Sequence, residues 1–310
     1  MRFFRRKKKV GVALSGGAAR ALSHIGVLEV LEKMGVRPQA IAGTSMGAII
    51  GSFYCTGVTL EDMKSYIKSM NWKSFLLFSD LALSRTGVIN GRRIEEVLKK
   101  FLGNKTFNDC RIPFCCVAAD LVKREKVILS EGKLIDAVRA SISIPGFISA
   151  VYLDKKILVD GGIIEPLPVE SMSIFDVNFM IASSISFDME KEKYTRFLDE
   201  EGNRLSSEEM KFKQKKEPGE RSIKDRIFNI KKTVMMRERV PEKLSVNKVL
   251  DTSFNIMHQQ LVRNSIKSAN IVIEPEVGDF GFFDLVRGSQ IIQRGVEAAQ
   301  KKIPEIRRKL

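Results

Sequence analysis

The chain has 310 residues, of which 44% are hydrophobic and 29% charged, values that allow a sizeable core and exclude wholesale disorder. Its 52 Lys and Arg against 37 Asp and Glu give a formal net charge of +15, which favours a polyanionic partner such as nucleic acid, an anionic membrane surface or an acidic substrate. Four cysteines form no C-x-x-C pair and no cluster with zinc spacing, so we expect reduced thiols and no metal site.

The chain begins with a basic tail at residues 1–9, MRFFRRKKK. The apolar stretch that follows, residues 10–14, is too short for the core of a signal peptide. No later run reaches the ~18 apolar residues of a membrane-spanning helix. We therefore expect a cytoplasmic protein. The tail, with Phe3 and Phe4 among its cations, is either a solvated extension or a peripheral contact with the anionic inner face of a membrane.

The first 57 residues predict two successive strand–turn–helix units, from the alternation of short apolar runs, glycines and helical spacing. The elements are a strand at 10–14, a Gly-rich turn at 15–17, a helix at 18–34, a strand at 40–42, a tight turn at 43–47 and a helix at 48–55. This order predicts a parallel sheet with helices on its faces.

The rest of the chain divides at a change in composition near residue 188. Before it, residues 59–102 are mostly helical in pattern with a turn at 84–87; strands follow at 114–120, 126–129, 156–159 and 179–184, with a short helix at 134–140. From 188 to 247 mixed charge predicts an exposed, partly mobile insertion. Beyond it we expect an amphipathic helix at 249–268, a strand at 271–273 and a final helix at 290–301.

Gly43-Thr44-Ser45-Met46-Gly47 is a G-x-S-x-G pattern between a predicted strand and a predicted helix. A nucleophile elbow turns so sharply that side chains two residues either side of the serine would clash, which explains Gly43 and Gly47. Such a turn exposes the serine hydroxyl at a helix N-terminus, where developing negative charge is stabilised. The alternative is a tight packing turn without chemistry.

A second Gly-rich turn, Gly16-Gly17-Ala18, also lies between a strand and a helix. Its small residues leave backbone N–H groups that can point at one anion. The sequence lacks the G-K-[ST] of a phosphate-binding loop and the spacing of G-x-G-x-x-G. An oxyanion hole for Ser45 explains both turns together, whereas a phosphate site explains only one.

Ser45 needs a base, and the sequence offers three candidates. His24 falls within the first predicted helix and His258 within a late one, positions that favour packing over catalysis. Asp160 ends a predicted strand and precedes Gly161 and Gly162. A carboxylate that is partly desolvated can take the serine proton directly, although Asp-Gly-Gly is also a common β-turn.

Three stretches in order resemble the patatin-like phospholipase family: residues 15–57, RASISIPGF at 139–147 and VDGGIIEPLPVE at 159–170. The resemblance covers about residues 10–185, with a weaker echo at 275–299. It implies a three-layer α/β/α fold with a mostly parallel central sheet, a patatin-like catalytic domain at 10–187 and a C-terminal segment, 248–310, that completes the same domain.

The resemblance also implies a catalytic dyad that needs no cofactor. By this resemblance Ser45 is the nucleophile and Asp160 the general base. The expected oxyanion hole consists of the amides of Gly16, Gly17 and Ala18, and the expected supporting residues are Arg20, Gly43, Gly47, Gly161 and Gly162. Some positions depart from the family pattern: Ser15 and Ala21 stand where glycines are common, Ala18 fills the centre of the loop, and Glu165 stands where asparagine is frequent.

We therefore expect a serine hydrolase that cleaves fatty-acyl esters of lipids, with a lipid ester as its partner. An acyltransferase would use the same dyad, and a weakly catalytic, lipid-binding regulatory protein would keep the fold. Nucleic-acid binding is disfavoured, because one Trp and four Tyr provide no aromatic-studded basic surface.

Overall fold

The computed structural model describes residues 8–69, 92–185, 246–281 and 284–310. The described residues up to Ile185 and from Phe254 onward belong to the first of two units of the chain. The predicted insertion at 188–247 lies outside the described residues except for its last two, and the basic tail at 1–9 except for Lys8 and Lys9. The turn predicted at 84–87 also lies outside them.

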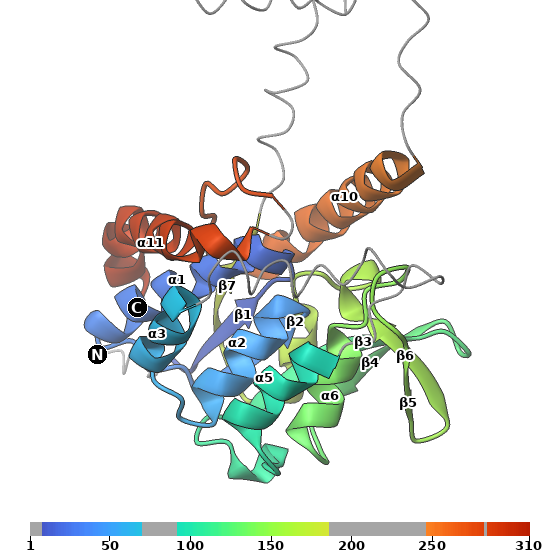
Figure 1. Cartoon of the computed structure of the whole chain (residues 1–310). Coiled ribbons are helices and arrows are strands. Elements are labelled where there is room, and N and C mark those ends of the chain that lie inside the picture. Colours follow the sequence, from blue (N-terminus) through green and yellow to red (C-terminus); the bar gives the residue numbers. More distant parts are fainter. Residues whose placement is uncertain (1–7, 70–91, 186–245, 282–283) are drawn as a thin grey trace, which may run out of the picture. The chain divides into compact units, whose positions relative to one another are not determined.

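An eight-stranded sheet forms the centre of the first unit, in the order β5-β6-β3-β2-β1-β7-β8, with β4 paired to β3 (Figure 1). The strands β3, β2, β1, β7 and β8 run parallel to one another, whereas β4, β5 and β6 form antiparallel pairs. The expected mostly parallel sheet is confirmed. The strand bounds are β1 (Val10–Leu14), β2 (Ala40–Thr44), β3 (Phe114–Asp120), β4 (Glu125–Leu129), β5 (Val151–Leu153), β6 (Lys156–Asp160), β7 (Phe179–Ser183) and β8 (Ile271–Ile273).

The helices of the described residues follow the predicted order. They are α1 (Ser23–Lys33), α2 (Met46–Cys55), α3 (Leu60–Ser69), α5 (Arg92–Leu102), α6 (Leu134–Ser141), α10 (Val246–Ser265) and α11 (Gly288–Lys309). Short 3-10 segments are η1 (Ala18–Leu22), η3 (Phe107–Asp109), η4 (Gly161–Ile163), η5 (Glu170–Ile174), η6 (Ile266–Ser268) and η7 (Leu285–Arg287). The segment predicted as one helix at 18–34 is thus a 3-10 turn followed by α1. Its first residue, Ala18, has a positive φ of 49°.

Residues of β1 alternate between two apolar layers, which confirms the three-layer architecture. Val12 and Leu14 belong to the core that contains the buried faces of α1, α2 and α11. Ala13 points to the other side, where it belongs to a cluster with Leu167 and with Val262 of α10. Figure 1 shows α2, α5 and α6 lying across one face of the sheet. The sheet is thus buried on both faces, as parallel strands require.

Helices α1 and α11 pack with their backbones in close contact. A Cβ added at Gly295 would lie 1.9 Å from the carbonyl oxygen of Ser23, and one added at Gly26 would lie 2.1 Å from that of Ile292. The C-terminal helix is therefore an integral part of the fold. In the described ranges, no helix combines the length and apolar character needed to cross a membrane.

Candidate active site

Ser45 lies at a sharp turn between β2 and α2, as the G-x-S-x-G pattern predicts. Its φ of 55° and ψ of −126° lie in a region that L-residues rarely occupy. A Cβ added at Gly43 would lie 2.5 Å from the carbonyl oxygen of Gly47, and one added at Gly47 would lie 2.3 Å from that of Leu14. Both glycines are therefore required by the geometry of the turn. Ser45 occupies the N-cap of α2, at the positive end of the helix dipole.

The Gly-rich turn after β1 lies directly against this elbow. Leu14 pairs with Gly43 in the parallel ladder, so the two turns leave the sheet at the same end. A Cβ added at Gly16 would lie 3.2 Å from the Cβ of Ser45. A side chain at this position would be in tight contact with the serine, so glycine gives the two turns room to lie together.

The three amides expected to bind an oxyanion differ in whether their N–H groups already have a hydrogen-bond acceptor. The N–H of Gly16 donates to the carbonyl of Pro166 at 2.9 Å. Gly17 caps η1 with a φ of 148°, and Ala18 is its first residue, with a φ of 49°. The first N–H groups of a 3-10 turn have no partner within the turn. Gly17 and Ala18 are therefore the stronger candidates for donating to an anion.

Asp160 reaches Ser45 across β3. Thr44 pairs with Val117, and the next residue of β3, Ala118, pairs with Asp160 at the end of β6. The Ser45 hydroxyl donates to Asp160 Oδ2 at 2.6 Å, and both residues are buried, with 7% and 4% exposure. The hydroxyl proton is thus directed at a carboxylate, as the sequence analysis expected.

Hydrogen bonds fix both the side chain and the backbone of Asp160. Asp160 Oδ1 accepts from the N–H of Gly162 at 2.7 Å, and the Asp160 N–H donates to the carbonyl of Ser143 at 2.9 Å. A Cβ added at Gly161 would lie 2.3 Å from the carbonyl oxygen of Val117. Only glycine therefore fits at this position against β3. Gly161 and Gly162 therefore aim the carboxylate at Ser45.

Burial raises the pKa of Asp160 from 3.8 to about 6, against the opposing effects of its hydrogen bonds from Ser45 and Gly162. A carboxylate with this pKa is a stronger base than an ordinary aspartate and is still ionised at neutral pH. Burial also lowers the pKa values of His24 and His258 to about 4, so both histidines are uncharged at neutral pH.

His24 is a structural neighbour of the Gly-rich turn. Its Nε2 lies 2.9 Å from the carbonyl oxygen of Ser15, so this nitrogen carries the proton. Its Nδ1 then accepts from the hydroxyl of Ser183 at 2.7 Å. The predicted packing role of His24 fits this geometry. Through these two hydrogen bonds His24 links Ser15, the first residue of the Gly-rich turn, to Ser183 at the end of β7. Residue spacing alone does not reveal this role.

Arg20 is buried, but its side chain is directed toward the C-terminal segment. Its Nε donates to the carbonyl of Phe280 at 2.7 Å. This hydrogen bond ties the predicted loop to the region of the weaker sequence echo at 275–299. Arg20 therefore joins two distant parts of the chain.

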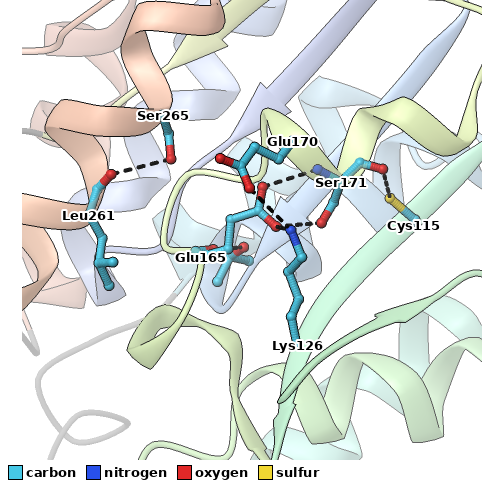
Figure 2. A network of polar contacts seen from close by, with 8 residues as sticks. Cys115, Lys126, Glu165, Glu170, Ser171, Leu261 and Ser265 are labelled. Carbon is cyan, nitrogen blue, oxygen red and sulfur yellow. Dashed lines mark hydrogen bonds and ion pairs between the residues drawn. The ribbon is translucent and has the colours of Figure 1, made fainter. Parts of the chain in front are cut away.

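Glu165 forms a polar network behind the two turns (Figure 2). Its carboxylate accepts from the N–H of Ser171 at 3.0 Å and from the Ser171 hydroxyl, and it lies 3.0 Å from Lys126 Nζ. Its backbone carbonyl accepts from the hydroxyl of Thr44 at 2.9 Å. The next residue, Pro166, accepts from Gly16. Glu165 therefore fixes the segment that contacts both the elbow and the Gly-rich turn.

The sequence analysis identified Glu165 only as a departure from a pattern. Its buried carboxylate is balanced by Lys126, which comes from β4 and lies 39 residues earlier in the chain. No local spacing connects the two residues. In the described part of the chain, no group of three or more His, Cys, Asp or Glu side chains could hold a metal ion.

Comparison with known proteins identifies the family. A buried serine at an elbow, a carboxylate in contact with it and an adjoining Gly-rich turn define a candidate serine hydrolase site on an α/β sheet. The family model described as patatin-like phospholipase matches residues 12–173, more than half of the chain. The chain belongs to the patatin-like phospholipase family.

Several curated relatives match slightly more than half of this chain. An NTE family protein of Mycobacterium tuberculosis is 34% identical over 178 residues, which cover 57% of this chain and 49% of that protein. Lysophospholipase NTE1 of Candida glabrata is 29% identical over 182 residues, covering 57% of this chain and 10% of that protein. The chain thus spans about half the length, or less, of these relatives. The structure of VipD from Legionella pneumophila aligns with a TM-score of 0.39 and 13% identity over 96% of this chain and 75% of that one.

Proposed function

We propose that this protein is a lipid acyl hydrolase that cleaves fatty-acyl esters with Ser45 as nucleophile and Asp160 as general base. The observation that carries the proposal is the 2.6 Å hydrogen bond from the Ser45 hydroxyl to a buried carboxylate. Membership of the patatin-like phospholipase family supports a lipid ester as the substrate class.

The reaction proceeds in two steps. Asp160 takes the proton of Ser45 as the serine oxygen attacks the acyl carbonyl, and the carbonyl electrons move onto its oxygen. The amides of Gly17 and Ala18 donate to that oxyanion, and the N-terminus of α2 adds a favourable dipole. As the oxyanion collapses, the ester C–O bond breaks, and Asp160 returns its proton to the departing alcohol.

Water then completes the cycle. Asp160 removes a proton from a water molecule, whose oxygen attacks the acyl-enzyme carbonyl. Collapse of the second oxyanion breaks the bond to Ser45, and the proton returns to the serine oxygen. The fatty acid leaves, and the dyad is restored. An acyltransferase differs only in the second step, where another alcohol replaces water.

The test measures free fatty acid released from a panel of a diacyl phospholipid, a lysophospholipid and a triacylglycerol, with and without an added acceptor alcohol. The proposal predicts fatty-acid release that disappears in Ser45→Ala and falls by at least a thousandfold in Asp160→Asn. Transfer of the acyl group mainly to the added alcohol would assign transferase activity. Equal release by the parent and Ser45→Ala would contradict the proposal.

A further inference from the structure

The turn between β3 and β4 and the strand β5 expose large apolar side chains to water. Leu121 and Val122, in the turn between β3 and β4, are 50% and 62% exposed, and Tyr152 on β5 is 80% exposed. We call these three residues the rim patch. A solitary exposed apolar residue needs no explanation, but a contiguous group of them marks a surface for interaction.

The strand register connects Leu121 and Tyr152, two members of the rim patch, through Ile157; Val122 is next to Leu121 in the chain. The N–H of Leu121 donates to the carbonyl of Ile157 at 2.9 Å, extending the antiparallel ladder between β3 and β6. Ile157 pairs in turn with Tyr152. Residues that pair directly across strands have their side chains on the same face. Leu121, Ile157 and Tyr152 therefore form a row across three adjacent strands.

The row lies beyond the candidate dyad at the same end of the sheet. Asp160 pairs with Ala118, and Leu121 lies three residues further along the chain from Ala118. At 3.3 Å per residue this places the row about 10 Å from the level of Asp160. One leaflet of a bilayer is about 20 Å thick including its headgroups. The offset between the row and the level of Asp160 is thus smaller than the thickness of one leaflet.

Exposed cations outnumber exposed anions in the turns at 121–124 and 154–155, where Asp154 is the one exposed carboxylate. Lys123, Arg124 and Lys155 are all exposed at the tips of the two turns. Lys123 pairs with Glu125 at 3.7 Å, whereas Arg124 and Lys155 have no ion pair with any described residue. Asp154 and Lys155 form a two-residue hairpin turn with φ values of 48° and 64°, a conformation that favours glycine or asparagine. A charged side chain thus occupies the tip of a turn where it costs stability.

We propose that the rim patch docks the protein onto an anionic phospholipid surface, with Leu121, Val122 and Tyr152 entering the interface and Arg124 and Lys155 contacting lipid phosphates. The occupant follows from the composition of the surface, since apolar side chains flanked by cations match the acyl–headgroup boundary of an anionic leaflet. The inference rests on the proposed function, because it places the dyad facing a lipid substrate.

The test measures co-sedimentation with vesicles of phosphatidylglycerol and phosphatidylcholine and, in parallel, with vesicles of phosphatidylcholine alone. The full chain carries Ser45→Ala so that the vesicles are not hydrolysed. Leu121→Ser, Val122→Ser and Tyr152→Ser are combined in one variant, and Arg124→Ser and Lys155→Ser in another. Ile174→Ser is the matched control, because Ile174 is 46% exposed and lies away from the rim patch. It is on η5, which precedes β7 and is therefore at the opposite end of the parallel strands from the candidate site.

The proposal predicts that the apolar variant loses at least tenfold in partitioning and that the control does not change. The charge variant loses about thirtyfold on anionic vesicles, the effect of two cations near such a surface, and little on neutral ones. Binding by the apolar variant equal to its parent would overturn the proposal, as would a parent that does not bind. Loss of binding only on replacing the lysines of residues 7–9 would assign docking to the basic tail instead.

Failure of docking and failure of the proposed function are distinguishable. A soluble short-chain ester reports on the dyad without any membrane, so its turnover by the chain with Ser45 intact tests catalysis alone. Vesicle binding by the Ser45→Ala chain tests docking alone. Turnover of the soluble ester without vesicle binding would leave the hydrolase proposal standing and reject the docking surface.

Discussion

The raised pKa of Asp160 predicts the pH dependence of catalysis. Only the ionised carboxylate accepts the Ser45 proton, so acylation should increase with pH through about 6. A base with that pKa is about one tenth ionised at pH 5 and about nine tenths ionised at pH 7. The rate of labelling by a fluorophosphonate should therefore increase about tenfold over this interval and level off above pH 7.

The two histidines make this profile specific to the carboxylate. The pKa values of His24 and His258 are about 4, and the chain has no other histidine. An inflection near pH 6 therefore reports on Asp160. A labelling rate that stays constant from pH 5 to 8, or one with its inflection near pH 4, would refute the assignment of Asp160 as a buried base.

The same shift in pKa has a consequence for stability. The pKa of Asp160 is about 6 in the folded protein and 3.8 in the unfolded chain. The stabilisation from this group is therefore fully present below pH ~4 and is lost as the pH rises through 6. Two units of pKa correspond to about 3 kcal/mol. At pH 8, Asp160→Asn should increase the free energy of unfolding by up to about 3 kcal/mol while strongly slowing labelling. A destabilised Asp160→Asn variant in urea unfolding would contradict the burial argument.

Three further substitutions test the surroundings of the dyad. Gly47→Ala should lower stability by about 3 kcal/mol and eliminate labelling, because the new Cβ meets backbone; a normal melting temperature would count against the elbow geometry. Ala18→Gly should remove the cost of a left-handed residue, about 1 kcal/mol, and raise the melting temperature by about 2 °C; a lower melting temperature would contradict this. Glu165→Gln should cost about 1–3 kcal/mol in urea unfolding, whereas Glu170→Gln, exposed beside the same Lys126, should cost under about 0.5; equal losses would deny Glu165 its role.

The sequence predicts the parallel part of the sheet well because its signals are local. Apolar runs at 10–14, 114–120 and 271–273 have the bounds of β1, β3 and β8 in the structure. The runs of β1 and β3 are buried on both faces, and that of β8 is buried at its two outer residues, so continuous apolar residues identify each strand locally. The three-residue strand β5 was not predicted. It lies in the apolar run at 150–153, but its first and last residues are only partly buried and Tyr152 is exposed.

The candidate site divides in the same way. Ser45 and Asp160 could be identified because an elbow and an Asp-Gly-Gly turn have recognisable local patterns. Gly16 shows the limit, since its amide is bonded to Pro166, 150 residues away. The bond from Arg20 to Phe280 spans 260 residues and is equally invisible to local spacing. Such pairings arise from the packing of distant segments, which a single sequence does not encode in its periodicity.

Direct identification of an activated serine is the decisive measurement. The purified full chain is incubated with a fluorophosphonate at pH 7.5, and the modified peptide is located by mass spectrometry, alongside Ser45→Ala and Asp160→Asn. The account predicts one adduct on Ser45, none in Ser45→Ala and strongly slowed formation in Asp160→Asn. A folded protein with no adduct, an adduct at another residue, or labelling of Asp160→Asn at the parent's rate would contradict it.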